Sequence, residues 1–244
     1  MPGLLSNFGK ALLNKWRLGP REILATHCLL CADRAPAHGI CEDCWSELPW
    51  LAAPCCTICA HPLPMPGVCG RCLAEPPNFD RVIASTCYRF PVDGLIQSYK
   101  YGGQLATIRA LADMLILHKP QQADLIVPMP LSVQRLRERG FNQALELARV
   151  VAQSVQAPID AKICVKTRDT SPQTRLPWKE RHKNIRGAFV VQGDVTGRHV
   201  VVIDDVLTTG ATLNELARNL KRAGAASVTG WIIARTVASG GAGA

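Results

Sequence analysis

The sequence predicts an α/β domain with a mostly parallel sheet flanked by helices, preceded by a small cysteine-rich module. Three observations carry this prediction. From residue 81 onward, short apolar stretches typical of strands alternate with stretches of helical periodicity. Residues 200–203 form a β-branched run of the kind that is buried on both faces of a parallel sheet. In addition, eight of the 11 cysteines fall into two sets of equal spacing near the N-terminus.

The 244 residues suffice for one medium-sized domain with its own core and a smaller module. We expect an N-terminal segment, the cysteine-rich module, the α/β domain and a tail without structure, over residues 1–24, 25–75, 76–238 and 239–244. The first segment has apolar residues on one helical face, which suits packing on the protein itself or, alternatively, binding to a membrane surface. No run of about eighteen uncharged apolar residues occurs, so we expect no integral membrane segment.

The strands and helices of the α/β domain follow from the apolar pattern. The sequence predicts a strand, a short helix and a longer amphipathic helix over residues 82–88, 95–101 and 105–117. A second strand over residues 125–127 ends in Pro128-Met129-Pro130, because proline cannot continue a ladder of hydrogen bonds. Two further helices and a closing strand are expected over residues 144–155, 213–222 and 228–234.

The cysteine-rich module is a duplicated unit with the spacing C-x2-C-x9-C-x2-C. Its two sets are Cys28, Cys31, Cys41 and Cys44, and then Cys56, Cys59, Cys69 and Cys72. Paired C-x2-C motifs supply the four thiolates of a structural zinc site, so we expect two zinc ions and no open position for catalysis. Pairing within each repeat is favoured over a crossed arrangement.

Disulfides are the competing interpretation of these cysteines. A secretory signal is not expected, because polar residues interrupt the N-terminal apolar positions and no clear small-residue cleavage site follows them. Together with a nucleotide-type loop further along the chain, this favours the reducing cytoplasm, in which thiolates bind metal rather than form disulfides.

The nucleotide-type loop follows the β-branched run at residues 200–203. Asp204 and Asp205 come directly after that run, and the loop itself consists of Thr208, Thr209, Gly210, Ala211 and Thr212. Free backbone N–H groups, threonine hydroxyls and the positive end of the following helix suit a phosphate. Two carboxylates repel that phosphate, so a ribose diol or a magnesium ion on a diphosphate is their expected partner. The alternative is a strand–turn–helix with incidental acids.

Residues 200–212 closely resemble the phosphoribosyl diphosphate (PRPP) signature of type I phosphoribosyltransferases. The resemblance implies that Asp204 and Asp205 contact the ribose hydroxyls, that the loop holds the 5-phosphate, and that PRPP binds with magnesium. It also implies that Met129, in the turn after the second strand, belongs to the loop that contacts pyrophosphate. A plain strand-terminating turn is the alternative for Met129.

A basic element follows, with the sequence R-L-R-E-R-G-F-N-Q over residues 135–143. Guanidinium groups bind phosphate oxygens in bidentate fashion, so Arg137 and Arg139 are candidate diphosphate ligands, unless they belong to a solvated helix face. Together with Tyr99-Lys-Tyr-Gly102, the cysteine repeat and the acidic segment, this element resembles the ComF family over nearly the whole chain. That family includes ComFC-like competence proteins and proteins labelled GntX, so the resemblance implies a link to DNA uptake.

The stretch over residues 167–189 is polar, basic and interrupted by two prolines, which predicts a mobile loop. Type I phosphoribosyltransferases close such a loop over the substrate and thereby exclude water. The family resemblance in this stretch includes Arg168, Gln173 and Arg181. A solvated insertion without a ligand is the alternative.

Two functions are therefore weighed. The first is Mg-dependent displacement of pyrophosphate from the ribose C1 of PRPP by an acceptor that the sequence does not identify. The second is a non-catalytic competence factor that binds single-stranded nucleic acid and uses the fold as a PRPP sensor or scaffold. The net charge of +9, concentrated in residues 131–190, suits either anionic partner. A third hypothesis is that the N-terminal parts dock a DNA-uptake or helicase protein.

Overall fold

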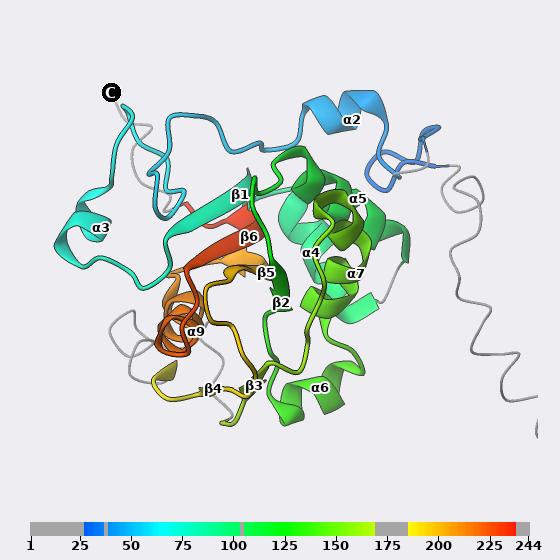
Figure 1. Ribbon diagram of the computed structural model, residues 1–244. Coiled ribbons are helices and arrows are strands. Elements are labelled where there is room, and N and C mark those ends of the chain that lie inside the picture. Colours follow the sequence, from blue (N-terminus) through cyan, green and yellow to red (C-terminus); the bar gives the residue numbers. More distant parts are fainter. Residues whose placement is uncertain (1–26, 37–38, 103–104, 169–184, 238–244) are drawn as a thin grey trace, which may run out of the picture.

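The computed structural model describes residues 27–36, 39–102, 105–168 and 185–237 (Figure 1). Three predictions fall outside these residues: the N-terminal segment over 1–24, most of the predicted mobile loop with Gln173 and Arg181, and the tail over 239–244. In the described part of the chain, no helix combines the length and apolar character needed to cross a membrane.

The α/β prediction is confirmed by a four-stranded sheet in the order β1-β6-β5-β2. Its strands are β1 (Arg81–Cys87), β2 (Leu125–Pro128), β5 (His199–Leu207) and β6 (Ser227–Arg235). All three neighbouring pairs are parallel. A separate antiparallel pair, β3 (Cys164–Lys166) and β4 (Phe189–Val191), lies on either side of the undescribed part of the predicted loop.

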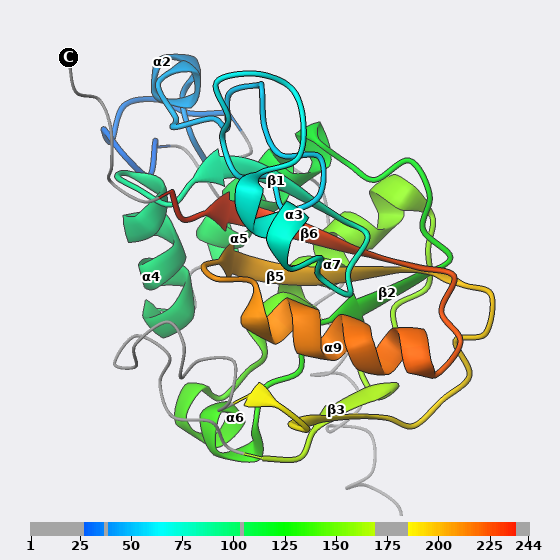
Figure 2. The same cartoon turned by 90° about the vertical axis from the view of Figure 1, so that its left-hand side faces the viewer.

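Helices cover both faces of the sheet, as expected for a parallel sheet. They are α4 (Val92–Gly102), α5 (Leu105–Leu117), α6 (Val133–Arg139), α7 (Gln143–Val155) and α9 (Ala211–Arg222). Figure 2 shows α9 in front of the sheet and α5 and α7 behind it. Consecutive side chains of a strand point to opposite faces, so Val200 and Val202 join the core with α9, whereas Val201 and Ile203 join the core with α5 and α7.

Two of the boundaries that differ from the prediction lie on either side of the predicted phosphate loop. β5 continues to Leu207 because β6 runs beside it, with Leu207 opposite Arg235, so Asp204 and Asp205 lie within the strand rather than after it. α9 begins at Ala211, so Ala211 and Thr212 form its first turn and the connecting loop is shorter. The reason is Gly210, which adopts a left-handed φ of 82° as N-cap.

The cysteine-rich module contains two short helices, α2 (Glu42–Ser46) and α3 (Gly70–Ala74), each of which begins directly after the third cysteine of its set. The module runs along β1, the edge strand of the sheet (Figure 1). The Val82 N–H donates to the Ile58 carbonyl at 2.8 Å, and the Leu51 N–H donates to the Ser85 carbonyl at 2.9 Å. These bonds satisfy backbone groups that an edge strand leaves unpaired.

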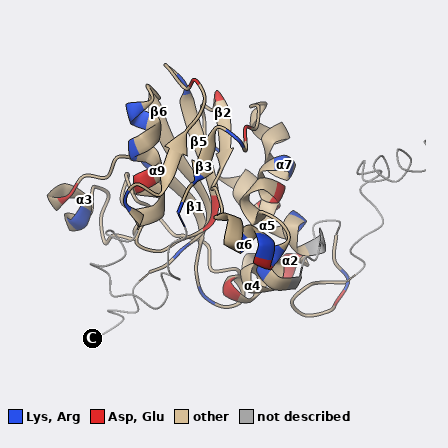
Figure 3. Ribbon diagram, turned by 90° about the horizontal axis from the view of Figure 1, so that it is seen from below, with Lys and Arg blue, Asp and Glu red and all other residues tan. Residues whose placement is uncertain are grey.

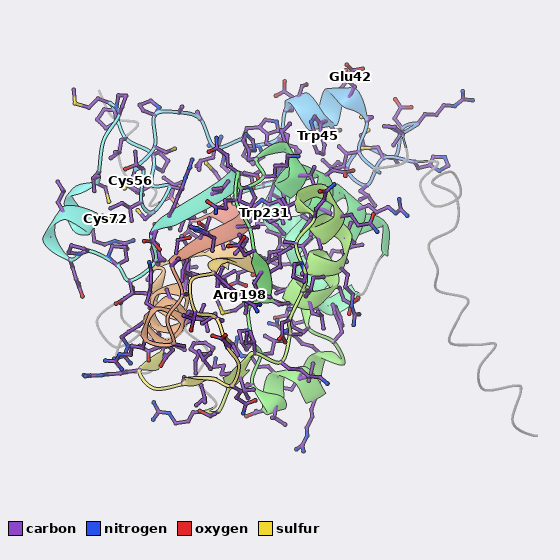
Figure 4. All side chains as sticks on the ribbon, viewed as in Figure 1. Glu42, Trp45, Cys56, Cys72, Arg198 and Trp231 are labelled. Carbon is purple, nitrogen blue, oxygen red and sulfur yellow. The ribbon has the colours of Figure 1, made fainter. Side chains whose placement is uncertain are left out.

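We predict that two aromatic side chains, one buried and one exposed, differ in how much they contribute to the stability of the domain. Trp231 is fully buried, and its Nε1 donates to the Leu115 carbonyl at 3.1 Å (Figure 4). We expect Trp231→Ala to lower the free energy of unfolding by about 3–5 kcal/mol, because it leaves a cavity and removes a buried hydrogen bond. Phe90→Ala, at a side chain that is 84% exposed, is the control and should change it by less than about 0.5 kcal/mol. Chemical denaturation measures both, and similar values for the two variants would contradict this packing.

Candidate functional site

The two acids stand in β5, between its neighbours β2 and β6. Asp205 Oδ2 forms an ion pair with Lys100 Nζ at 2.9 Å, and both side chains are largely buried. Desolvation, together with the adjacent charge of Asp205, raises the pKa of Asp204 to about 7. The positive charges of Lys100 and Lys166 act in the opposite direction without cancelling this effect. The site therefore holds two carboxylates close together, one of them resisting ionisation near neutral pH.

Lys100 is a site residue that sequence reasoning missed. It lies on α4, far along the chain from β5, within the Tyr99-Lys-Tyr-Gly102 element that supports the family resemblance. Motif spacing gives no indication that its ammonium group meets a carboxylate of β5. The one indication in the sequence was that Lys100 belongs to the Tyr99-Lys-Tyr-Gly102 element, to which we had assigned no role.

The same element connects the acids to the basic helix α6. The Tyr99 hydroxyl donates to the Gln143 carbonyl at 2.9 Å, and its ring centroid lies 5.9 Å from that of Phe141. The guanidinium carbon of Arg139 lies 5.8 Å from the centroid of the Tyr101 ring, a cation–π arrangement. Three consecutive residues of α4 thus contact the R-x-R-G-F-N-Q segment on one side and the acidic strand on the other.

The expected neighbour relation of β2 and β5 is present, with Pro128 opposite Ile203. Met129 follows immediately and is buried. Its N–H donates to the Ile203 carbonyl at 2.9 Å, and its carbonyl accepts a bond of 3.2 Å from Asn142 Nδ2. Met129 therefore lies beside the acids, but both its backbone groups already have partners.

The candidate diphosphate arginines lie on α6. Arg137 is exposed and Arg139 is half-buried against Tyr101. Figure 3 shows the basic residues of α6 at the end of the molecule where α4 also lies. Neither arginine is paired with Asp204 or Asp205, so their guanidinium groups can face an anionic ligand.

The phosphate loop connects β5 to α9. Thr208 is exposed, Thr209 is half-buried, and Gly210 and Ala211 are buried, so only part of the predicted loop faces solvent. Thr209 Oγ1 accepts the Ala211 N–H at 3.2 Å and thereby satisfies one of the free donors at the start of α9. A helix N-terminus of this kind suits a phosphate.

The base of the predicted mobile loop lies close to the acids. Lys166, the last residue of β3, is buried, and its charge favours the ionised form of Asp204. Arg168 is exposed and donates to the Arg186 carbonyl on the other side of the loop. The Gly187 N–H donates to Glu215 Oε1 at 2.7 Å, which attaches the loop end to α9. Lys166 is a second residue to which the sequence analysis assigned no specific role.

The structure brings each predicted set of four cysteines together within its own repeat. In both sets the four Sγ atoms lie within 4.8 Å of one another. Cys28 Sγ accepts the Cys41 N–H at 3.4 Å, and at the equivalent place Cys56 Sγ accepts the Cys69 N–H at 3.3 Å. Such bonds stabilise thiolates: although desolvation opposes the effect, backbone donors lower the pKa of both Cys28 and Cys56 to about 6. Each donor set therefore fits a tetrahedral zinc ion.

Comparison with known proteins agrees with this architecture. A model of the double zinc ribbon domain matches residues 21–73, and a model of the phosphoribosyl transferase domain matches residues 106–240. The chain therefore belongs to the phosphoribosyl transferase domain family and carries an N-terminal double zinc ribbon with two four-cysteine zinc-binding sites.

Individual relatives confirm the resemblance to ComF-type proteins. The DNA utilization protein YhgH of Escherichia coli K12 is 35% identical over 170 residues, which are 66% of this chain and 75% of that protein. Competence protein F of Haemophilus influenzae is 31% identical over 219 residues, 85% of this chain and 90% of that protein. Among solved structures, the glutamine PRPP amidotransferase of B. subtilis complexed with ADP and GMP matches 50% of this chain and 25% of its own, at 23% identity and a TM-score of 0.36.

The acid pair predicts a pH-dependent stability. The pKa of Asp204 is higher in the folded state, at about 7, than in the unfolded chain. As the pH rises, Asp204 therefore ionises first in the unfolded chain, and the free energy of unfolding falls until the pH exceeds about 7. Asp204→Asn removes this cost, so we expect it to raise the melting temperature, and more at about pH 8 than at about pH 5.

Asp194→Asn is the control with the opposite sign. Hydrogen bonds from Thr196 lower the pKa of Asp194, so its ionised form stabilises the fold and its substitution should lower the melting temperature at pH 8. Calorimetric unfolding of both variants at the two pH values measures the effect. An Asp204→Asn variant that is no more stable than the parent protein at pH 8 would contradict a cost at this site.

Proposed function

We propose that the protein binds PRPP with magnesium at the carboxyl edge of β5 and transfers its phosphoribosyl group to an acceptor. The observation that supports this most directly is the acid pair within β5, which precedes the N-terminus of α9 and lies beside the turn at Met129. The acids suit a diol or a metal ion, the N-terminus of α9 suits a phosphate, and the basic helix α6 suits a diphosphate. Few ligands carry all of these groups.

Each group has a separate task in this proposal. Asp204 and Asp205 bind the ribose hydroxyls and hold magnesium, which offsets the negative charge of the diphosphate when bound. Residues Thr208, Thr209, Gly210, Ala211 and Thr212 hold the 5-phosphate. The turn at Met129, together with Arg137 and Arg139, accommodates the diphosphate, with Arg168, Gln173 and Arg181 on the closing loop.

The proposed reaction is a substitution at C1 of ribose. The bond from C1 to the diphosphate oxygen breaks, and pyrophosphate leaves with the electron pair. The acceptor then supplies the electron pair of the new bond and loses a proton. Positive charge develops on the sugar in between, and the carboxylates of β5 stabilise it. Lys100 holds the Asp205 carboxylate in place through their ion pair, so that this carboxylate can accept hydrogen bonds from the sugar.

Calorimetric titration with PRPP and magnesium tests the binding step. We expect binding that requires the metal and that weakens at least about a hundredfold in the Asp204→Asn, Asp205→Asn double variant, since charge-assisted hydrogen bonds contribute about 1.5–3 kcal/mol each. Asp194→Asn changes an exposed acid that precedes β5, whereas Asp204 and Asp205 lie near the other end of that strand, so it is the matched control and should bind as the parent protein does. Absence of binding by folded, zinc-loaded protein would refute the proposal. Release of pyrophosphate with bases, ammonia or nucleic acids as acceptors then separates an enzyme from a sensor.

A second candidate function, binding of single-stranded nucleic acid, is favoured by a specific surface feature. Phe90 and Tyr101 are 84% and 78% exposed, at the two ends of α4, and Arg89 and Arg139 accompany them. Exposed aromatic rings next to guanidinium groups form stacking platforms for unpaired bases. The names of the relatives, which refer to DNA utilization and competence, are compatible with this function.

This candidate predicts a selective loss. In the Phe90→Ser, Tyr101→Ser double variant, binding of a fluorescent oligothymidylate should weaken at least about tenfold, because base stacking contributes about 1–3 kcal/mol per base. Met65→Ser with Leu73→Ser removes similarly exposed apolar side chains from the zinc ribbon and is the control. Fluorescence anisotropy at several salt concentrations measures both, and equal affinity of all three proteins would exclude stacking at α4.

A further inference from the structure

Arg235, the last residue of β6, is a buried cation that joins two parts of the molecule. Only 3% of it is exposed. Its Nε donates to the Cys59 carbonyl at 3.1 Å, within the second cysteine set. Its Nη1 donates to the carbonyls of Leu207 and Thr208 at 3.0 and 2.5 Å, at the start of the phosphate loop. One guanidinium group therefore bridges the second zinc-binding site and the phosphate loop.

The charge of Arg235 needs a partner, because an unpaired charge in the protein interior is costly. Its hydrogen-bond acceptors are carbonyls and the Thr236 hydroxyl, and within the described residues its side chain is not part of a carboxylate ion pair. Four thiolates around one zinc ion retain a net negative charge of about two. The second zinc-binding site is thus the available counter-charge.

The two zinc-binding sites differ in how they are embedded. Cys56, Cys59, Cys69 and Cys72 are all buried and belong to the same core as α9. In the first set, Cys31 occupies the position equivalent to Cys59 and is exposed. A hollow between ribbon and loop is lined by Arg71 and Cys72 on one side and by Thr209 and Gly210 on the other, which shows how closely the second repeat approaches the loop.

We propose that Arg235 is a positioning residue through which the second zinc site, but not the first, holds the phosphate loop in its binding conformation. The four thiolates of the zinc site supply the counter-charge, the Cys59 carbonyl fixes the guanidinium, and the guanidinium fixes the carbonyls of Leu207 and Thr208. Their peptide planes determine where the following N–H groups point. The consequence for PRPP affinity rests on the proposed function, whereas the effect on the loop itself exists without any ligand.

Hydrogen exchange of the ligand-free, full-length protein tests the proposal directly. The variants are Arg235→Lys and Cys59→Ser, with Cys31→Ser as the matched control in the first repeat. We expect amides of residues 206–212 to exchange at least about tenfold faster in the first two variants, because hydrogen bonds from a charged group are lost. Amides of β2 report on the overall fold and should stay protected. Zinc released to a chromogenic chelator should fall by one ion per chain in both cysteine variants and remain at the parental value in Arg235→Lys.

Failure of the Arg235 proposal and failure of the proposed function give different results. Unchanged exchange of residues 206–212 in Arg235→Lys, or an equal increase in Cys31→Ser, overturns the proposal. If Cys59→Ser unfolds the chain, Arg235→Lys remains the test of the proposal. Lysine keeps the positive charge but cannot reach both the Cys59 carbonyl and the carbonyls of Leu207 and Thr208. PRPP titration of the same proteins then shows at least about tenfold weaker binding in Arg235→Lys. Failure of the parent protein to bind PRPP refutes the proposed function but leaves the exchange result as the test of Arg235.

Discussion

Two adjacent carboxylates lie within β5, and their position inside a hydrogen-bonded sheet governs the chemistry around them. β2 and β6 flank β5, so the backbone of Asp204 and Asp205 is held on both sides. Desolvation, together with the adjacent charge of Asp205, raises the pKa of Asp204, and a lysine from α4 forms an ion pair with Asp205. This arrangement is unfavourable for folding alone, which is typical of groups retained for a ligand. The neighbouring loop, turn and basic helix are arranged around the same strand end.

The double zinc ribbon contributes to this site as well as to folding. It satisfies backbone groups of the edge strand β1, and its second repeat is part of the main core. A metal held by four thiolates has no open position, so each zinc-binding site is structural. Arg235 connects the two, because its guanidinium group spans the distance from the Cys59 carbonyl to the Thr208 carbonyl. The family's pairing of ribbon and phosphoribosyl transferase domain thus has a physical basis in this chain.

The sheet and the main helices could be predicted because apolar periodicity is a local property. The same reasoning placed the end of β5 and the start of α9 incorrectly, since β6 prolongs β5 and the left-handed Gly210 starts α9 early. The ligand set of each zinc site was predictable from spacing. The contacts of Tyr99 with Phe141 and of Tyr101 with Arg139 were not, because helices distant in sequence make them.

The sequence by itself determined the fold class, the two cysteine sets and the acid pair with its phosphate loop. These features depend on residues close together in the chain, where residue type and spacing dictate the geometry. Only the tertiary structure decided that Lys100 neutralises Asp205, that Lys166 acts on Asp204, and that Arg235 joins the second zinc site to the loop. The physical reason is that charge interactions depend on distance and burial, and both are set by the packing of segments that the sequence keeps far apart.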